Sequence, residues 1–262
     1  MLKSIMGTSE NTKADILGVR LDTPGCDEAV RLITGWAKEG RQGYVCAADL
    51  KTVMQSYDSA DLKKVVDGAL LVTPDDLRLV WGLKLMGVKG ASKVAAPRLA
   101  LSLIGASAAA GVPIGFYGGS PEVLDRFIRD IRRRFPSIDV AFSFSPPDRP
   151  LLPHEDEAVT DWINASGARL MFVCMGGTRE GQWMAEHAGR VGALMFGAGD
   201  AFHLAGAGRR PLTPSALMQD IFSGRSPLPE YRHVFQHPRF MLLFSFQLLK
   251  KTLPVSRKLL PL

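Results

Sequence analysis

Short apolar runs that end in turn residues alternate along the chain with segments of helical periodicity. The runs typical of buried strands lie at 44–48, 69–72, 113–117, 139–144, 170–174 and 193–196. Between several of them, as at 27–38 and 121–135, apolar residues recur at helical spacing. Strands that alternate with helices are typical of βαβ units, so we predict an α/β fold with a doubly wound, mainly parallel, Rossmann-like sheet. A further run, at 14–22, alternates like an edge strand.

The junction after residues 69–72 carries two adjacent carboxylates, Asp75 and Asp76. Asp75 stands where a strand ends and a helix begins, which is where open α/β sheets bind ligands, so its carboxylate is a candidate general base. The alternative is that one of the pair caps the helix and the other is a first-turn acid favoured by the helix dipole. The helix is expected to turn Arg78 and Lys84 elsewhere and to bury the stripe Leu77, Val80, Trp81, Leu83 and Leu85.

Other strand-to-helix junctions carry an acid or paired glycines. Asp49 follows one strand and is the expected N-cap of the next helix. Gly118-Gly119 and Gly176-Gly177 follow two more strands, with Ser120 and Thr178 as expected N-caps. Such turns offer backbone N–H groups to a phosphate, although glycines also serve only to turn the chain tightly. Because these junctions share one sheet edge, we expect them to converge on a single cleft.

Two cations, Lys93 and Arg98, flank Pro97 where a loop enters an Ala-rich helix. Cations at the start of a helix oppose its dipole and do not help to stabilise it. An anionic ligand therefore explains this pair better than helix stability does.

The composition describes a globular chain that can bury a full core, with 262 residues of which 46% are hydrophobic. There is no secretory signal at the start and no apolar run of about 18 residues, the length that spans a bilayer. The cysteines, Cys26, Cys46 and Cys174, are expected to be core thiols in a reducing cytoplasm. The histidines lack metal-ligand spacing, so no metal and no cofactor is expected. No nucleic-acid module is present, and no Gly-x-Gly-x-x-Gly opens the first βα turn, which disfavours a dinucleotide oxidoreductase.

The basic excess lies at one end of the chain. Residues 222–262 contain seven Lys and Arg against the single acid Glu230, and the other residues are balanced. The apolar run 240–249, followed by Lys250 and Lys251, suits a segment in the headgroup layer of an anionic membrane. A core helix or a contact in a homo-oligomer are the alternatives. We therefore divide the chain into an α/β domain, 1–221, and a C-terminal basic amphipathic helical appendage, 222–262.

Six segments together resemble the WecG/TagA/CpsF family of glycosyltransferases in order and spacing, over residues 16–249. They are ILGVRLDTPGCDEAVRLITGWA (16–37), TPDDLRLVWGLKLMG (73–87), KVAAP (93–97), GFYGGSPEV (115–123), MGGTREGQWM (175–184) and FGAGDAFHLAG (196–206). The resemblance implies an inverting, metal-independent transfer of a hexose-type sugar from a UDP-sugar donor to a polyprenyl-diphosphate-linked acceptor in cell-surface or exopolysaccharide biosynthesis. It implies a cytoplasmic protein, peripheral on the inner face of the cell membrane, with Asp75 as catalytic base and Arg232 and Arg239 as ligands of the diphosphate.

Several positions depart from the family's pattern. The family's Thr-x-Asn is Ala47-Ala48-Asp49 in this chain, and a Gly of the family is Asp76. Glu180 replaces a Gln, and Gly181 replaces the acid that follows it. Lys93 replaces an Arg, and His203 replaces an Asp. An added carboxylate would repel a diphosphate unless cations such as Lys93, Arg98, Arg209 and Arg210 offset it. Altered sugar specificity and lost activity are both open, the latter giving a non-catalytic sugar-nucleotide-binding or assembly protein of a polysaccharide complex. The expected substrate-binding residues are Asp49, Asp76, Lys93, Arg98, Gly118, Gly119, Gly176, Gly177, Glu180, Arg232 and Arg239.

Overall fold

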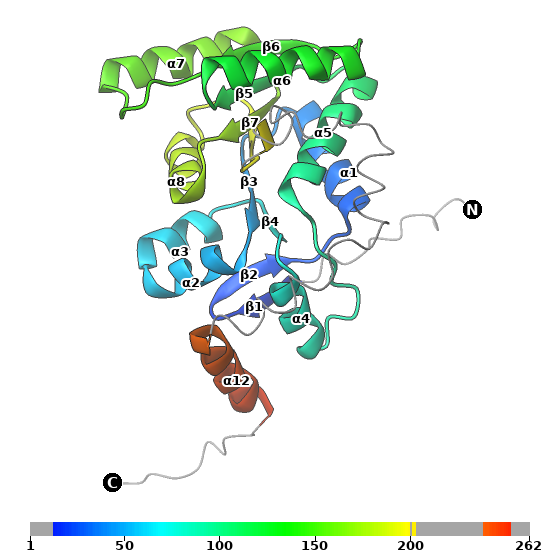
Figure 1. The fold of residues 1–262 in the computed structure, drawn as a ribbon, viewed down its shortest axis with the longest axis vertical. Helices are drawn as coiled ribbons and strands as arrows, with labels where there is room; N and C mark the ends of the chain where they lie inside the picture. Colours follow the sequence, from blue (N-terminus) through cyan, green and yellow to red (C-terminus); the bar gives the residue numbers. More distant parts are fainter. Residues whose placement is uncertain (1–12, 200, 203–237, 253–262) are drawn as a thin grey trace, which may run out of the picture.

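The computed structural model describes residues 13–199, 201–202 and 238–252, and its centre is a six-stranded parallel sheet (Figure 1). The strand order is β4-β3-β8-β7-β5-β6. The strands are β3 (Gly43–Ala48), β4 (Leu71–Pro74), β5 (Ile114–Gly118), β6 (Val140–Phe144), β7 (Leu170–Cys174) and β8 (Leu194–Gly197). The predicted α/β Rossmann-like fold is confirmed, and every pairing within this sheet is parallel.

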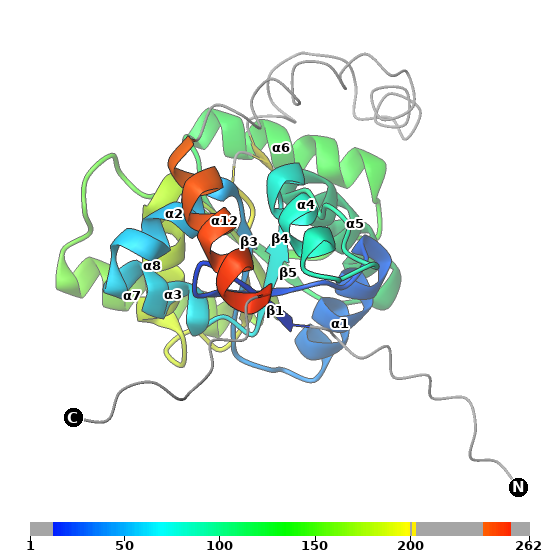
Figure 2. The same ribbon diagram turned by 90° about the horizontal axis from the view of Figure 1, so that it is seen from below.

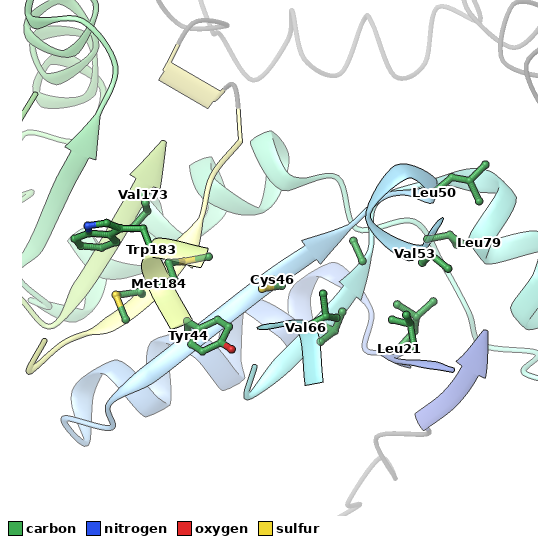
Figure 3. Close-up of a cluster of buried hydrophobic side chains, with 14 of the residues drawn as sticks. Leu21, Tyr44, Cys46, Leu50, Val53, Val66, Leu79, Val173, Trp183 and Met184 are labelled. Carbon is green, nitrogen blue, oxygen red and sulfur yellow. The ribbon is translucent and has the colours of Figure 1, made fainter. Parts of the chain in front are cut away.

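Helices cover both faces of the sheet, as a doubly wound fold requires. One face carries α1 (Cys26–Lys38), α5 (Ala96–Ala110) and α6 (Pro121–Arg134), and the other carries α2 (Leu50–Asp58), α3 (Ala60–Asp67), α7 (Pro153–Ser166) and α8 (Gly177–His187). Successive strand residues point to opposite faces, so Val45 joins the core under α1 and α5. Tyr44 and Cys46 join the core under α2, α3 and α8, which Figure 3 shows.

The first apolar run forms a hairpin and not the single edge strand expected from its alternation. β1 (Lys13–Ile16) pairs antiparallel with β2 (Val19–Asp22). Leu17 and Gly18 make the turn with φ of 52° and 83°, the left-handed region that tight hairpin turns use. The buried Asp22 then accepts a hydrogen bond from Val72 N at 2.8 Å, which fixes the hairpin beside β4.

The predicted buried stripe of α4 (Leu77–Leu85) is wrong in part. Leu79, Val80 and Leu83 are buried, whereas Leu77, Trp81 and Leu85 are exposed. The reason is the position of Gly82: a Cβ there would lie 3.1 Å from side-chain atoms of both Ile16 and Phe244, so the side of α4 near Gly82 faces the protein. The opposite side of α4 therefore faces outward.

The C-terminal helix, α12 (Pro238–Thr252), packs against the hairpin and α4 (Figure 2). Its buried rings, Phe240 and Phe244, stack with centroids 5.5 Å apart. Gln247 receives a hydrogen bond from Leu17 N and donates one to the Asp15 carbonyl, at 2.9 and 2.8 Å. Within the described ranges, no helix is both long enough and apolar enough to cross a membrane.

Candidate active site

The carboxylate of Asp75 lies at the carboxyl end of β4, between two other segments of the chain. Its backbone N–H donates to Ala48 O on β3 at 2.8 Å, and its Oδ2 accepts a hydrogen bond from Ala96 N, in the first turn of α5, at 3.1 Å. The side chain is partly buried, and burial is the main reason that the pKa of Asp75 rises to about 6, although the Ala96 N–H and Lys93 oppose the rise. Asp49 and Asp76 add smaller upward contributions, so the expected effect of Asp76 on this pKa has the right sign but is not the main cause.

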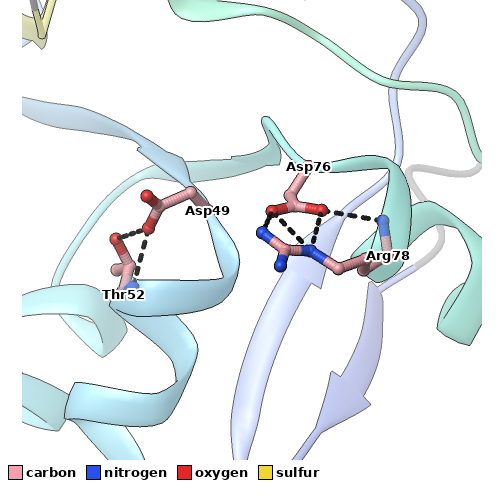
Figure 4. A network of polar contacts seen from close by, with 4 residues as sticks. All are labelled: Asp49, Thr52, Asp76 and Arg78. Carbon is pink, nitrogen blue, oxygen red and sulfur yellow. Dashed lines mark hydrogen bonds and ion pairs between the residues drawn. The ribbon is translucent and has the colours of Figure 1, made fainter. Parts of the chain in front are cut away.

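The neighbouring acids, Asp76 and Asp49, are helix caps (Figure 4). Asp76 accepts hydrogen bonds from Arg78 N at 2.8 Å and from Arg78 Nε at 2.9 Å. Burial would raise the pKa of Asp76, but the hydrogen bonds from Arg78 outweigh it and the pKa is lowered. Asp49 accepts hydrogen bonds from the backbone N and the hydroxyl of Thr52, both at 2.7 Å. Asp76 is thus the N-cap of α4, whereas Asp75 is bonded to the start of a different helix.

Asp75 lines a cavity of about 500 Å³ formed where β3, β4 and β8 end. The charged residues of its lining are Asp49, Lys51, Asp75 and Glu180, and Gly177 also lines it. We call this hollow the Asp75 cavity. Among the described residues of the lining, the carboxylates outnumber the cations, since Lys51 is the one basic side chain there.

Glu180 is buried between the ends of β7 and β8. Its two carboxylate oxygens accept hydrogen bonds from Met175 N and Gly199 N, both at 3.3 Å. A Cβ on Gly197 would lie 2.6 Å from Glu180 Oε1, so glycine leaves the space that this carboxylate occupies. Burial and then the charge of Glu180 raise the pKa of the Cys46 thiol to about 12, which keeps that core thiol protonated.

The glycine turn after β5 lines a different and larger cavity, of about 1150 Å³. Gly118 has φ of 116°, and a Cβ there would lie 2.0 Å from Cys174 O, so only glycine fits. The chain leaves β5 toward α6 on one face and leaves β7 toward α8 on the other. This divergence is a topological switch point, the usual ligand site of open α/β sheets, and we call this hollow the switch-point cavity.

The expected single cleft is therefore two cavities with α8 between them. Thr178, Glu180 and Gly181 line the Asp75 cavity, whereas Arg179, Gln182 and Trp183 line the switch-point cavity. Gly176 is the N-cap of α8, with φ of 72° and no side-chain cap, so the expected capping by Thr178 is wrong.

Sequence comparison decides which family this fold and site belong to. The glycosyl transferase WecG/TagA/CpsF family model matches residues 14–221. The chain belongs to this family.

Membership in the WecG/TagA/CpsF family supports a glycosyltransferase role and agrees with the resemblance carried by the six sequence segments. The match includes Asp75, both cavities and both glycine turns. Across the described residues, no three His, Cys, Asp or Glu side chains gather in a way that could hold a metal ion.

The expected cations of the glycosyltransferase site lie in different places. Lys93 is exposed and acts on the Asp75 carboxylate, lowering its pKa against the effect of burial. Arg98 lies near the Cys26 thiol of α1, whose pKa burial raises and Arg98 lowers. Arg239 is held by Asp58, at the end of α2, through two hydrogen bonds of 2.8 and 2.5 Å. Arg232, like His203, Arg209 and Arg210, lies outside the described residues.

Sequence reasoning missed an aromatic stack that lines the switch-point cavity. Trp183 stacks on Tyr117 at 4.3 Å and on His187 at 4.0 Å, between ring centroids. His187 is buried, and its Nε2 lies 2.9 Å from Asp156 Oδ1. The spacing of Trp183 and His187, four apart on a predicted helix, was the available signal, because such residues share one helix face. Three arginines, Arg149, Arg179 and Arg190, also line this cavity.

Proposed function

We propose that this protein is an inverting, metal-independent glycosyltransferase that moves a hexose-type sugar from a UDP-sugar to a polyprenyl-diphosphate-linked saccharide in cell-surface or exopolysaccharide biosynthesis. The observation that carries the proposal is the carboxylate of Asp75, which is partly buried, lines a cavity at the carboxyl edge of the sheet, and has its pKa raised to about 6. A base with a pKa just below neutral is ionised in the cytoplasm and still takes up a proton readily.

In the proposed reaction, Asp75 removes the proton from the acceptor hydroxyl while that oxygen attacks the anomeric carbon of the donor sugar. The new glycosidic bond forms as the bond from the anomeric carbon to the diphosphate breaks, and UDP leaves with the electron pair. A single displacement of this kind inverts the anomeric centre. The other carboxylates of the cavity have structural roles, since Asp49 caps α2 and Glu180 accepts hydrogen bonds from Met175 N and Gly199 N.

The two cavities suggest how the donor is held. We assign the sugar and the acceptor hydroxyl to the Asp75 cavity and the UDP group to the switch-point cavity. Support for the second assignment comes from the Gly118-Gly119 turn at the start of α6, from the aromatic stack, and from Arg149, Arg179 and Arg190 in the lining. Backbone N–H groups at a helix start and guanidinium groups both suit phosphates.

The C-terminal appendage, 222–262, is proposed to hold the α/β domain, 1–221, at the inner face of the cell membrane. The described part of the appendage supports this, because α12 leaves the large apolar side chains Leu242, Phe246 and Leu249 exposed while it packs on the α/β domain through Phe240 and Phe244. The exposed Lys250 follows these side chains in the sequence.

A second candidate function is a sugar-nucleotide-binding or assembly protein without catalytic activity. The observation in its favour is the charge of the Asp75 cavity, where Asp49 and Glu180 stand at positions that are neutral in the family's pattern. A diphosphate is repelled by such a lining, and the sugar is bonded directly to the diphosphate, so catalysis requires cations near the Asp75 cavity that offset these carboxylates.

Calorimetric titration with UDP, followed by a screen of UDP-sugars with a polyprenyl-diphosphate sugar as acceptor, separates the two functions. The transferase proposal predicts UDP binding and the appearance of an inverted product with at least one donor. Binding without turnover for every donor would favour the non-catalytic function, and no UDP binding would contradict both.

A further inference from the structure

Two helices from distant parts of the chain leave large apolar side chains exposed. On α4, the stripe Leu77, Trp81 and Leu85 is 37%, 56% and 66% exposed, with a spacing of four residues that places it on one helix face. On α12, Leu242, Phe246 and Leu249 are 72%, 57% and 54% exposed, with spacings of four and three residues. Each of the two helices is thus apolar on two sides: one side packs on the protein, and the other side faces outward.

The two helices that carry the exposed stripes lie next to each other. Gly82 of α4 contacts the ring of Phe244 on α12, so the two helices touch, and Figure 2 shows them side by side on the side facing the viewer. We call the surface formed by Leu77, Trp81, Leu85, Leu242, Phe246 and Leu249 the α4–α12 face. Large exposed apolar side chains that gather on neighbouring helices are typical of interaction sites in soluble proteins.

The two segments that carry the α4–α12 face contain cations and no acids. From Leu77 to Pro121 the chain contains five Lys and Arg and no Asp or Glu, and the same absence of acids holds for 238–252. Of these cations, Lys84, Lys89, Lys93 and Lys250 are exposed, whereas Arg78 and Arg239 are paired with Asp76 and Asp58. The Lys250 ammonium lies 4.6 Å from the centre of the Phe246 ring, so a cation and an apolar group reach the surface together. An apolar patch bordered by lysines is complementary to an anionic lipid surface.

We propose that the α4–α12 face is the docking surface for an anionic lipid bilayer, with α4 of the α/β domain entering the headgroup layer beside α12. Trp81 is suited to this position because an indole ring prefers the boundary between acyl chains and headgroups. The proposal goes beyond membrane attachment by the appendage alone, because it adds a membrane contact that the α/β domain itself supplies.

The α4–α12 face lies close to the candidate active site, which suggests a functional role for the membrane contact. This role rests on the proposed function. Leu77 is two residues from Asp75, and Asp76 between them caps α4. A bilayer in contact with Leu77 therefore lies close to the Asp75 cavity. A lipid-linked acceptor then reaches the base without leaving the membrane surface.

The test is co-sedimentation of the full chain with vesicles of phosphatidylglycerol and phosphatidylcholine, and with vesicles of phosphatidylcholine alone. The double variant Trp81→Ser, Leu85→Ser is expected to lower the partition coefficient on anionic vesicles by about tenfold or more. The matched control is Trp162→Ser, since Trp162 is 57% exposed but lies on α7, at the opposite end of the molecule (Figure 1). The control is expected to stay within about twofold of the wild type.

A second pair of measurements keeps the outcomes distinct. Lys84→Glu with Lys89→Glu is expected to weaken binding to anionic vesicles and to leave the weak binding to neutral vesicles unchanged. Thermal melting confirms that the variants fold, and UDP titration is expected to be the same in all of them. Unchanged vesicle binding by the variant Trp81→Ser, Leu85→Ser would overturn the proposal. If that variant instead loses self-association and still binds vesicles, the face is a contact with a second copy of the chain. Failure of UDP binding in every protein, with vesicle binding intact, would instead contradict the proposed function.

Discussion

The two cavities on either side of α8 differ mainly in their charge. Among the described residues, the Asp75 cavity is lined by three carboxylates, Asp49, Asp75 and Glu180, and by one lysine. In the part of the chain that the structure describes, three acids and three arginines line the switch-point cavity. One of these acids, Asp156, lies within 3.0 Å of both His187 and Arg190. A cavity that concentrates negative charge suits proton removal, and a balanced cavity with arginines and a glycine turn suits an anionic group. The difference agrees with the proposed division between base chemistry in one cavity and nucleotide binding in the other.

The sheet itself keeps the two regions apart. β4, which ends at Asp75, and β5, which ends at Gly118, are four strand positions apart. At about 4.8 Å per spacing, this places the two junctions about 19 Å apart along the edge. Under the proposed assignment, the uridine and the base contact different parts of the substrates, so variants on the two sides of α8 should have separable effects.

The largest expected effect is on turnover in the variant Asp75→Asn. Removal of a general base lowers kcat by about 10²–10⁴-fold. The Asn amide oxygen still accepts from Ala96 N, so the start of α5 is kept. The neighbouring variant Asp76→Asn is the control, because Asn also caps helices well and a loss of less than about tenfold is expected. Transfer assays with both variants check this prediction, and equal losses would show that the effect is not specific to Asp75.

The pH dependence of turnover sharpens the comparison. Because burial raises the pKa of Asp75 to about 6, the base is ionised above that pH and protonated below it. We expect kcat/KM to be level between about pH 7 and 8 and to fall about tenfold per unit below about pH 6. A profile of initial rates of the wild type from pH 5 to 8 tests this. A rate at pH 5 as high as the rate at pH 8 would contradict the prediction.

The variant Glu180→Gln tests whether the negative charge of the Asp75 cavity acts on the nucleotide across α8. Removal of one negative charge from α8, the helix between the two cavities, should tighten UDP binding by about tenfold, because a carboxylate repels the diphosphate. Gln keeps one oxygen to accept from Met175 N or Gly199 N. Glu157→Gln, an exposed acid on α7, is the matched control and should leave the dissociation constant unchanged. Weaker UDP binding in Glu180→Gln would mean that Glu180 itself holds the nucleotide.

The smallest expected effect is on stability. The raised pKa of Asp75 means that the folded protein binds this proton more strongly than the unfolded chain does between the unfolded value, about 3.9, and about 6. The contribution of this carboxylate to stability therefore falls as the pH rises through that window. Asp75→Asn should stabilise the protein at pH 8 by about 1 kcal/mol, with the partial exposure of the side chain taken into account, and have no effect near pH 3.5. Thermal melts of both proteins at the two pH values measure the difference, and equal shifts at both would contradict it.

The local elements could be predicted from the sequence, and their arrangement could not. The strands at 44–48 and 170–174, the cap at Asp49 and the Gly118-Gly119 turn depend on neighbouring residues, and the structure confirms them. The two cavities depend on strand order, since β8 lies between β3 and β7, and sequence position does not reveal that order.

The face of α4 is a second feature that the sequence leaves open. Its apolar residues occur on two sides, so periodicity alone does not show which side is buried. Contacts from Ile16 and Phe244, which are distant in the chain, decide that Leu83 is buried and Trp81 is exposed. The pairing of Arg239 with Asp58 is equally a matter of tertiary structure.

The most direct test of the central claim is the dissociation constant of UDP for Asp75→Asn, compared with that for Arg179→Ala, a change in the switch-point cavity. If the two cavities divide base chemistry from nucleotide binding, Asp75→Asn binds UDP within about twofold of the wild type, and Arg179→Ala binds it about tenfold more weakly. A loss of UDP affinity in Asp75→Asn as large as its loss of turnover would contradict the claim.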